Sequence, residues 1–374
     1  LAMLLSPGLP ARWARFRGHP LWWPSVAFVA VQLLALALMP RYAETVGNLW
    51  HGGRIVATLA LALMLDRDET LWGLRAFAAG AAYALVVVLV HQAVGLPDWP
   101  VWQNLQVHLG NKSIADALLF ALAASTALLW ALERGGWWRW AGVGLAAVLI
   151  AIDIWWLPSR TSVLGVLVVL VAACVHRWRR HRLALTLAIA SCLLLAAATI
   201  AAVPFLRERF ELGVSEVQRA SVGDVAHESW SVRYHMYTRT WDMIRERPWT
   251  GWGIGSWNTQ WRGRVPELLH GYNMPHNDFL WMGAQAGVMG ALILVALAGV
   301  TLVPGWRRQD LTGRLALAAG LTLIQATCWN SAMRDAAIGL SLLWVTGLYL
   351  RIAQEEGDAL DAVFNVRARR SRQP

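Results

Sequence analysis

Ten separate apolar runs divide this sequence of 374 residues, and they constrain its fold more than any other feature. A water-soluble domain carries about 25% charged residues, whereas this chain has 15% together with 57% hydrophobic residues. Apolar runs of this kind cross a bilayer as helices, because the only other spanning structure is a closed barrel of alternating ten-residue strands. The sequence therefore predicts an all-α polytopic bundle of about ten to twelve transmembrane helices. The runs cover roughly residues 24–39, 50–65, 74–96, 114–132, 138–157, 162–175, 183–203, 277–302, 315–329 and 336–352.

The basic residues orient this bundle. With the N-terminus on the cytoplasmic side, the short cytoplasmic segments hold 19 of the 33 arginines and lysines, and the short outer loops hold five. The other nine lie in one long outer segment, where the positive-inside rule does not count them. We therefore expect both termini in the cytoplasm. The predicted organisation is N-terminal transmembrane helices over 1–203, a periplasmic loop over 204–275, C-terminal transmembrane helices over 276–352 and a cytoplasmic tail over 353–374.

The long outer segment contains an amphipathic helical pattern that ends at Pro248. Apolar residues recur there at spacings of four and three: Trp230, Tyr234, Tyr237, Trp241 and Ile244. We expect this helix either to lie flat on the membrane or to pack over the mouth of the bundle. Glycines then follow at positions 251, 253 and 255. They favour a flexible turn, and the alternative is a loop whose backbone N–H groups approach an anionic lipid head group.

Two outward-facing arginines are candidates for anion binding. Arg160 lies in a very short hairpin between two spans, on the side where arginine is disfavoured, and Arg233 lies beside the aromatic stripe. In the simpler interpretation Arg160 reaches lipid phosphate and Arg233 is a solvated surface residue. In the functional interpretation each planar guanidinium holds a phosphate or diphosphate group at the membrane surface.

His276 is the best candidate for acid–base chemistry. It precedes Asn277 and Asp278, which have a structural explanation as N-cap residues of the long apolar helix that follows. A helix N-terminus disfavours the imidazolium, so the imidazole is expected to stay neutral and able to accept a proton. The alternative is an interfacial histidine without a chemical role.

The residues that usually bind metals are arranged unfavourably for a metal site. The three cysteines lie in apolar runs without a C-x-x-C motif, and the outer face has no paired histidine or aspartate motif. We therefore expect guanidinium groups alone to neutralise phosphate charge, in a reaction that needs no divalent cation. No cofactor and no nucleic-acid partner are expected.

Several stretches, most of them in the second half of the chain, form a recognisable set. The first is Pro275-His276-Asn277-Asp278-Phe279-Leu280, which continues to Gly287-Val288-Met289-Gly290. The second is Arg233 with its aromatic helix, followed by Arg247-Pro248-Trp249-Thr250-Gly251-Trp252-Gly253. The third is the Ser159-Arg160 hairpin. This set resembles the signature of the O-antigen ligase and O-antigen polymerase superfamily. One departure is Gln285, where many members carry a glutamate, and we interpret it as supporting structure.

The resemblance implies a membrane-embedded glycosyltransferase of the O-antigen ligase type, with its active site on the periplasmic face of the bacterial inner membrane. The donor would be a glycan on undecaprenyl diphosphate, and the acceptor a sugar hydroxyl of lipid A–core, in an inverting step of lipopolysaccharide biosynthesis. Arg160 and Arg233 would bind the diphosphate and stabilise its departure, while His276 would accept the acceptor proton or orient the hydroxyl. Membrane lipids are further partners. We expect three neighbours to complete the substrate-binding site: Trp252, Gly253 and Asn277.

The sequence leaves four other functions open. An O-antigen polymerase would use the same chemistry with a growing glycan as the acceptor, and a protein O-oligosaccharyltransferase would glycosylate a protein. A lipid or solute transporter would place ionisable residues near the bilayer midplane, and these spans are almost free of charge. A non-catalytic assembly scaffold is the fourth. The single moderate outer loop and the small size of the chain favour the ligase.

Overall fold

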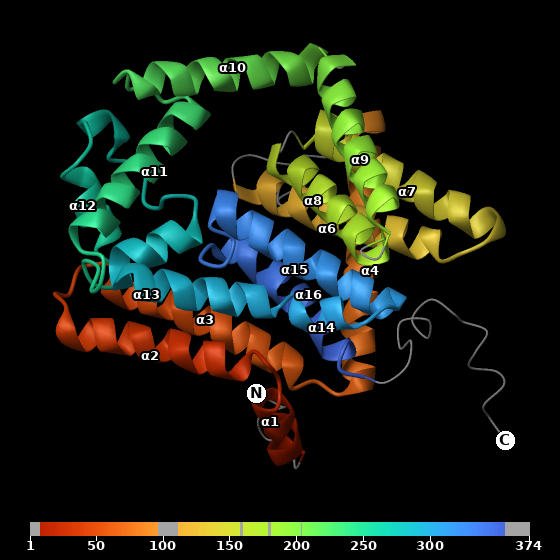
Figure 1. Ribbon diagram of the computed structural model, residues 1–374, viewed down its shortest axis with the longest axis horizontal. Coiled ribbons are helices and arrows are strands. Elements are labelled where there is room, and N and C mark those ends of the chain that lie inside the picture. The colour runs from red at the N-terminus through yellow and green to blue at the C-terminus, as the bar shows by residue number, and fades with distance from the viewer. Residues whose placement is uncertain (1–7, 96–110, 158–159, 179–180, 203, 356–374) are drawn as a thin grey trace.

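The fold is seen in a computed structural model that describes residues 8–95, 111–157, 160–178, 181–202 and 204–355 (Figure 1). Within these residues every regular element is a helix, and no strand occurs. Each of the ten apolar runs predicted from the sequence overlaps one helix, apart from end residues of some runs, which lie beyond the helix or outside the described residues. These helices are α2 (Trp22–Leu38), α3 (Thr45–Leu63), α4 (Arg67–Val94), α6 (Asn111–Leu132), α7 (Gly136–Trp155), α8 (Arg160–Trp178), α9 (Arg182–Ala202), α13 (Asp278–Val300), α15 (Leu311–Asn330) and α16 (Ala336–Ile352).

Six of these helices, α4, α6, α7, α9, α13 and α15, are long and apolar enough to cross a membrane. A seventh span forms if α2 is joined to the short α1 (Leu9–Arg17), although the two are bent by 86° at the turn between them. The all-α polytopic bundle is therefore confirmed, with fewer clear spans in the described residues than the ten to twelve predicted. In α8 and α16 the apolar stretches that lie within the described residues cover Leu164–Cys174 and Gly339–Ile352. In α3 the first half carries polar residues, and two of them, His51 and Arg54, lie near the candidate site described below.

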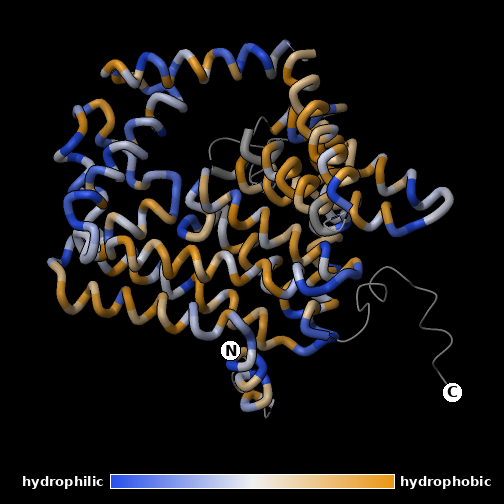
Figure 2. Tube along the Cα trace, in the orientation of Figure 1, coloured by the Kyte–Doolittle hydropathy of each residue, from blue (hydrophilic) through white to orange (hydrophobic). Residues whose placement is uncertain are grey.

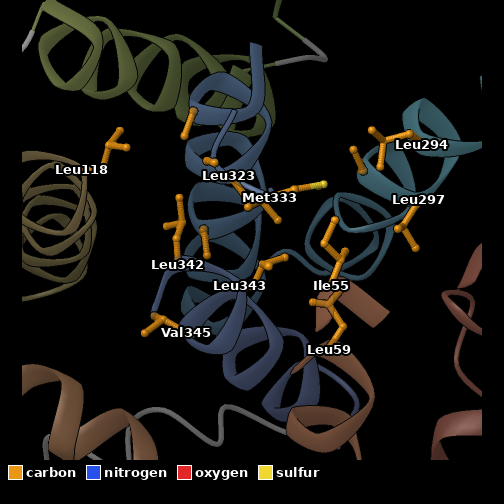
Figure 3. Packing of buried hydrophobic residues seen from close by; sticks show 14 of the residues in the cluster. Ile55, Leu59, Leu118, Leu294, Leu297, Leu323, Met333, Leu342, Leu343 and Val345 are labelled. Atoms are coloured by element: carbon orange, nitrogen blue, oxygen red, sulfur yellow. The ribbon is translucent and has the colours of Figure 1, made fainter. Parts of the chain in front are cut away.

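The bundle packs around α13, α15 and α16 (Figure 3). Helix α13 lies against α2 and α15, and α16 contacts α3, α4, α6 and α15. The buried centre includes Leu323 of α15 with Leu342 and Leu343 of α16. Small residues let two of these backbones approach closely, because a Cβ on Gly347 of α16 would lie 2.5 Å from the Cβ of Ala62 in α3. This packing places the start of α3, the start of α13 and the turn between α15 and α16 at one end of the bundle.

A polar segment joins α9 to α13 at that same end. It forms α10 (Pro204–Ser221), α11 (Ser229–Glu246), α12 (Trp257–Arg262) and a short 3-10 turn at Glu267–Leu269. In Figure 1, α10 crosses above the bundle and α11 descends from it towards the start of α13. Figure 2 contrasts the many polar residues of this segment with the apolar helices of the bundle. The predicted amphipathic helix is α11, which ends two residues before Pro248, whereas α10 was not predicted.

The buried face of α11 differs from the predicted aromatic stripe. Its buried residues include several outside the stripe and only one within it: Val232, Met236, Thr240, Met243 and Ile244. Trp241 of the stripe is 53% exposed, and Trp230 packs against Phe210 of α10 with ring centroids 6.4 Å apart. The helix therefore packs over the bundle, as one of the two alternatives predicted. None of its tryptophan or tyrosine side chains is fully buried, and the helix packs mainly against α10 and α13.

We expect the two ends of the bundle to label oppositely with a membrane-impermeant thiol reagent. In a variant whose three native cysteines are replaced by alanine, a cysteine at Val222, which is 84% exposed after α10, should react in intact spheroplasts. A cysteine at the exposed Arg139, near the start of α7, should react only after the membrane is opened, because the arginine excess predicts that this end of the bundle is cytoplasmic. The reverse pattern would invert the assignment of the periplasmic face.

Candidate active site

Helix α13 is broken inside the bundle, and this break positions the candidate site. Beyond Gln285 the backbone leaves the helical conformation, and Gly287 has a φ of 70°. The carbonyl oxygens of Ala284 and Gln285 accept hydrogen bonds from the N–H groups of Trp252 and Gly253, both at 2.9 Å. Backbone groups freed from a helix at membrane depth need such partners, because lipid offers none. The segment of residues 248–256, which we call the glycine segment, therefore completes the backbone hydrogen bonding of α13.

Two further contacts fix the glycine segment to α13. The N–H of Val288, beyond the break, donates to the carbonyl oxygen of Pro248 at 2.7 Å. The side-chain amide of Gln285 is fully buried, and its Oε1 accepts a hydrogen bond from the N–H of Gly255. Gln285 therefore has the supporting role expected of it from the sequence.

The glycines are required by both backbone conformation and space. Gly251, Gly253 and Gly255 have φ values of 65°, 101° and 85°, a region that residues with a Cβ rarely adopt. A Cβ on Gly251 would also lie 2.4 Å from the carbonyl carbon of Gln285. The segment is thus fixed by hydrogen bonds to α13, and it is not the flexible turn that the sequence favoured. Its N–H groups at residues 251, 252, 253 and 255 all donate within the protein.

The turn between α2 and α3 holds the other side of the glycine segment. The Tyr42 hydroxyl donates to the carbonyl oxygen of Trp252 at 2.9 Å, and the Thr45 hydroxyl donates to that of Ile254 at 2.7 Å. A Cβ on Gly255 would lie 2.5 Å from the backbone nitrogen of Thr45. The segment is therefore clamped between the start of α3 and the break in α13, and it fixes the distance between these two helices.

Trp252 also ties the segment to α11. Its indole N–H donates to the carbonyl oxygen of Met243 at 2.9 Å. Its ring is faced by two guanidinium groups, with Arg247 at 4.1 Å and Arg264 at 4.9 Å from the ring centroid. These contacts are structural, and the expected role of Trp252 and Gly253 in substrate binding stays a prediction.

His276 lies between α11 and the turn that follows α15. Asn277 is the N-cap of α13, and its side-chain oxygen accepts the N–H of Leu280 at 3.0 Å, as predicted. His276 has a φ of 53°, a left-handed conformation that is uncommon for a residue with a side chain and that occurs often at functional sites. Burial, and then the charge of Arg233, lower the pKa of His276 to about 4. The imidazole is therefore neutral at pH 7 and can accept a proton.

Arg233 approaches His276 from α11. Its Nη2 lies 3.4 Å from Oδ1 of Asn330, at the end of α15. One turn along α11, the Tyr237 hydroxyl donates to the carbonyl oxygen of Cys328 at 3.2 Å and lies 3.5 Å from that of His276. Burial raises the pKa of Tyr237 to about 12, so the phenol keeps its proton. Burial lowers the pKa of Arg233, but a guanidinium stays charged at neutral pH.

The turn between α15 and α16 adds a second arginine, Arg334, which was not among the predicted site residues. Its guanidinium lies 5.6 Å from the ring centroid of Trp281, one turn into α13. Burial lowers the pKa of Arg334, and the carboxylates of Asp278 and Asp335 oppose this shift. Arg334 and Asp335 also act on the pKa of His276, the first lowering it and the second raising it. Both residues therefore belong to the surroundings of the imidazole.

Helix α3 supplies a third arginine to the same place. Arg54 donates a hydrogen bond from its guanidinium to the carbonyl oxygen of Arg334, and His51 lies one turn earlier on α3. The turn itself is held by Asp278, which is 1% exposed and accepts the N–H of Met333 at 2.8 Å. A sequence signal for the two extra arginines existed, because both are among the five basic residues of short outer loops.

The structure brings two of the three predicted catalytic residues together. Arg233 lies close enough to His276 for its charge to lower the pKa of the imidazole, whereas the side chain of Arg160 lies outside the described part of the chain. Its backbone begins α8, which packs against α6 and α15. In the described residues no group of three or more His, Cys, Asp or Glu side chains could hold a metal ion. The arrangement offers a neutral base beside several guanidinium groups, which suits proton abstraction next to a bound anionic phosphate.

Comparison with known families supports this interpretation. A family model described as O-antigen ligase matches residues 145–295. The matched stretch contains Arg160, Arg233 and His276, so the resemblance seen in the sequence is confirmed there. It indicates the O-antigen ligase and polymerase superfamily, whose members are membrane glycosyltransferase-like enzymes. No curated protein sequence matches the chain.

Replacing Gly251 by alanine should destabilise the protein. The left-handed backbone alone costs about 1–2 kcal/mol for a residue with a Cβ, and the added atom would meet the backbone of α13, which cannot shift without disturbing the break. The thermal unfolding midpoint in detergent is the measurement. Gly271→Ala is the matched control, since a Cβ there meets nothing within 4 Å. Equal midpoints for the two variants would contradict the proposed clamp.

The pH dependence of turnover should follow the lowered pKa of His276. Because the neutral imidazole is the acceptor, activity should be retained from pH 7 to about 5 and lost as pH falls through about 4. The measurement is kcat/KM against pH, with tryptophan fluorescence to verify that the protein stays folded. An acidic limb near 6.5, the ordinary pKa of histidine, would show that the imidazole is not buried beside Arg233.

Proposed function

We propose that this protein is an O-antigen ligase. It transfers a glycan from undecaprenyl diphosphate to a sugar hydroxyl of lipid A–core, on the periplasmic face of the bacterial inner membrane. The observation that carries the proposal is the neutral imidazole of His276 close to the guanidinium groups of Arg233 and Arg334, with Arg54 bonded to the backbone of Arg334. The family match over the stretch that contains His276 and Arg233 supports the same reaction class.

The proposed step is a direct displacement at the anomeric carbon of the donor. The acceptor oxygen forms a bond to that carbon, the bond from the carbon to the diphosphate oxygen breaks, and its electron pair leaves with the diphosphate. His276 takes the acceptor proton, which contributes about 10²–10⁴-fold to the rate. Because attack occurs opposite the leaving group, the anomeric configuration is inverted.

The guanidinium groups would stabilise the leaving diphosphate. We assign this role to Arg233 and Arg160, as the family resemblance implies. We add Arg334, whose charge acts on His276, and Arg54, which is hydrogen-bonded to the backbone of Arg334. Preorganised charge of this kind, aimed at the place where negative charge develops, lowers the activation barrier of many enzymes more than any other single effect. The positive charge of the site suits a diphosphate without a divalent cation, so the reaction is expected to proceed in EDTA.

The nearest alternative is an O-antigen polymerase, because it would use the same residues with a growing glycan as the acceptor. Complementation separates the two functions. Expression in a ligase-null strain should restore long-chain lipopolysaccharide bands if lipid A–core is the acceptor. Restored chain length in a polymerase-null strain, without rescue of the ligase-null strain, would select the polymerase and overturn the proposal.

Conservative substitutions should separate catalysis from simple charge. We expect Arg160→Lys and Arg233→Lys to fail in complementation, because an ammonium group cannot form the two-pronged contact that a guanidinium makes with diphosphate. His276→Asn should lower turnover by about 10²-fold or more, and asparagine tolerates the left-handed backbone at this position. The matched control is Arg239→Lys, on the exposed face of α11 beside Asp242. Normal lipopolysaccharide from Arg233→Lys at normal expression would remove Arg233 from the site.

A further inference from the structure

An apolar cavity of about 630 Å³ lies at the end of the bundle remote from His276. It is lined by α8, α9, α15 and the short α14 (Val303–Arg307), and the lining residues include Leu167, Val171, Val303, Leu317 and Leu321. Two more lining residues, Leu193 and Trp306, are 53% and 41% exposed, so the cavity opens on the surface of the bundle. Because this surface is apolar, the opening faces the acyl chains of the bilayer.

A polar pocket of about 320 Å³ lies next to the cavity, along the same two helices. Its Arg177 follows Ala172 of the cavity by five residues on α8, which is about 7.5 Å of helix. Its Arg314 precedes Leu317 of the cavity by almost one turn of α15. The polar pocket therefore lies nearer the membrane surface than the apolar cavity. A lipid has the same order, with its head group at the surface and its acyl chain further inside.

Arginines border both spaces. Arg314 pairs with Glu133 at 2.7 Å, so this carboxylate is already neutralised. Arg177 and Arg307 are exposed and make no ion pair with any residue that the structure describes. Arg307 lines the apolar cavity itself. Two exposed guanidinium groups, Arg307 in the apolar cavity and Arg177 in the polar pocket, leave a positive charge that an anionic head group would neutralise.

We propose that this pair of cavities binds one anionic phospholipid of the cytoplasmic leaflet. An acyl chain fills the apolar cavity between α8 and α15, and the phosphate is held by Arg177 and Arg307 with Arg314 behind them. The site is separate from the candidate active site, because α13 and its 23 residues, roughly 30 Å of helix, lie between the two ends. It is also independent of the reaction, since the diphosphate of a lipid-linked donor would lie at the opposite end.

The test uses the full-length protein, stripped of lipid in detergent, and native mass spectrometry with dioleoyl-phosphatidylglycerol. One bound lipid is expected, with much weaker binding of dioleoyl-phosphatidylcholine. The double variant Arg177→Gln/Arg307→Gln should bind about 5-fold more weakly for each arginine removed, from roughly 1 kcal/mol per arginine near a head group. Arg67→Gln/Arg139→Gln is the matched control, because it removes the same charge from exposed residues at the same end. It should bind as the wild type does.

A second variant tests the apolar cavity without changing charge. Val168→Trp should fill the cavity and abolish retention of the phospholipid while leaving the lipid-free thermal midpoint nearly unchanged. Equal binding of both phospholipids, or equal loss in the two double variants, would overturn the proposal. Preferential binding of undecaprenyl phosphate would overturn it too, because the cavity would then belong to a polyprenyl chain.

Discussion

The break in α13 is the constraint on which the candidate site depends. A membrane helix that leaves its regular hydrogen bonding must find partners within the protein, and here the glycine segment supplies them through Trp252, Gly253 and Pro248. The same segment is held by Tyr42 and Thr45 at the start of α3. One local requirement of α13 therefore sets the positions of α3, α11 and α13 relative to one another.

This clamp holds positively charged residues from different helices near one another at the candidate site. Arg233, Arg334 and Arg54 come from three elements that would repel one another if their charges were brought together freely. The repulsion between these charges is offset locally by Asp335 and by the ring of Trp281 next to Arg334. It is also offset by the buried Asp278, which holds the turn after α15. The excess positive charge that remains is suited to an anionic ligand. Burial, and then this positive charge, depress the pKa of His276, so the proposed binding and proton transfer would depend on one arrangement.

Sequence reasoning selected only some of the residues that meet at the candidate site, for reasons that individual residues illustrate. His276 and Arg233 were found because a histidine at a helix start and an arginine on the outer face both depart from local expectation. Arg334 and Arg54 carried the same signal, but nothing in the sequence places α3 beside the turn after α15. The buried face of α11 was misassigned for a related reason. Aromatic spacing defines a face, whereas the neighbours that cover it are known only from the fold.

The sequence by itself determined the helices, the orientation favoured by the arginines and the N-cap at Asn277, because hydropathy, the positive-inside bias and capping act over a few residues. Tertiary structure alone decided that the glycines are a clamp, since their close approach is to α13 and to the start of α3. It also decided which arginines meet around His276. Charges on separate helices become neighbours only through packing, and packing depends on contacts between residues more than 200 positions apart, such as Tyr42 with Trp252.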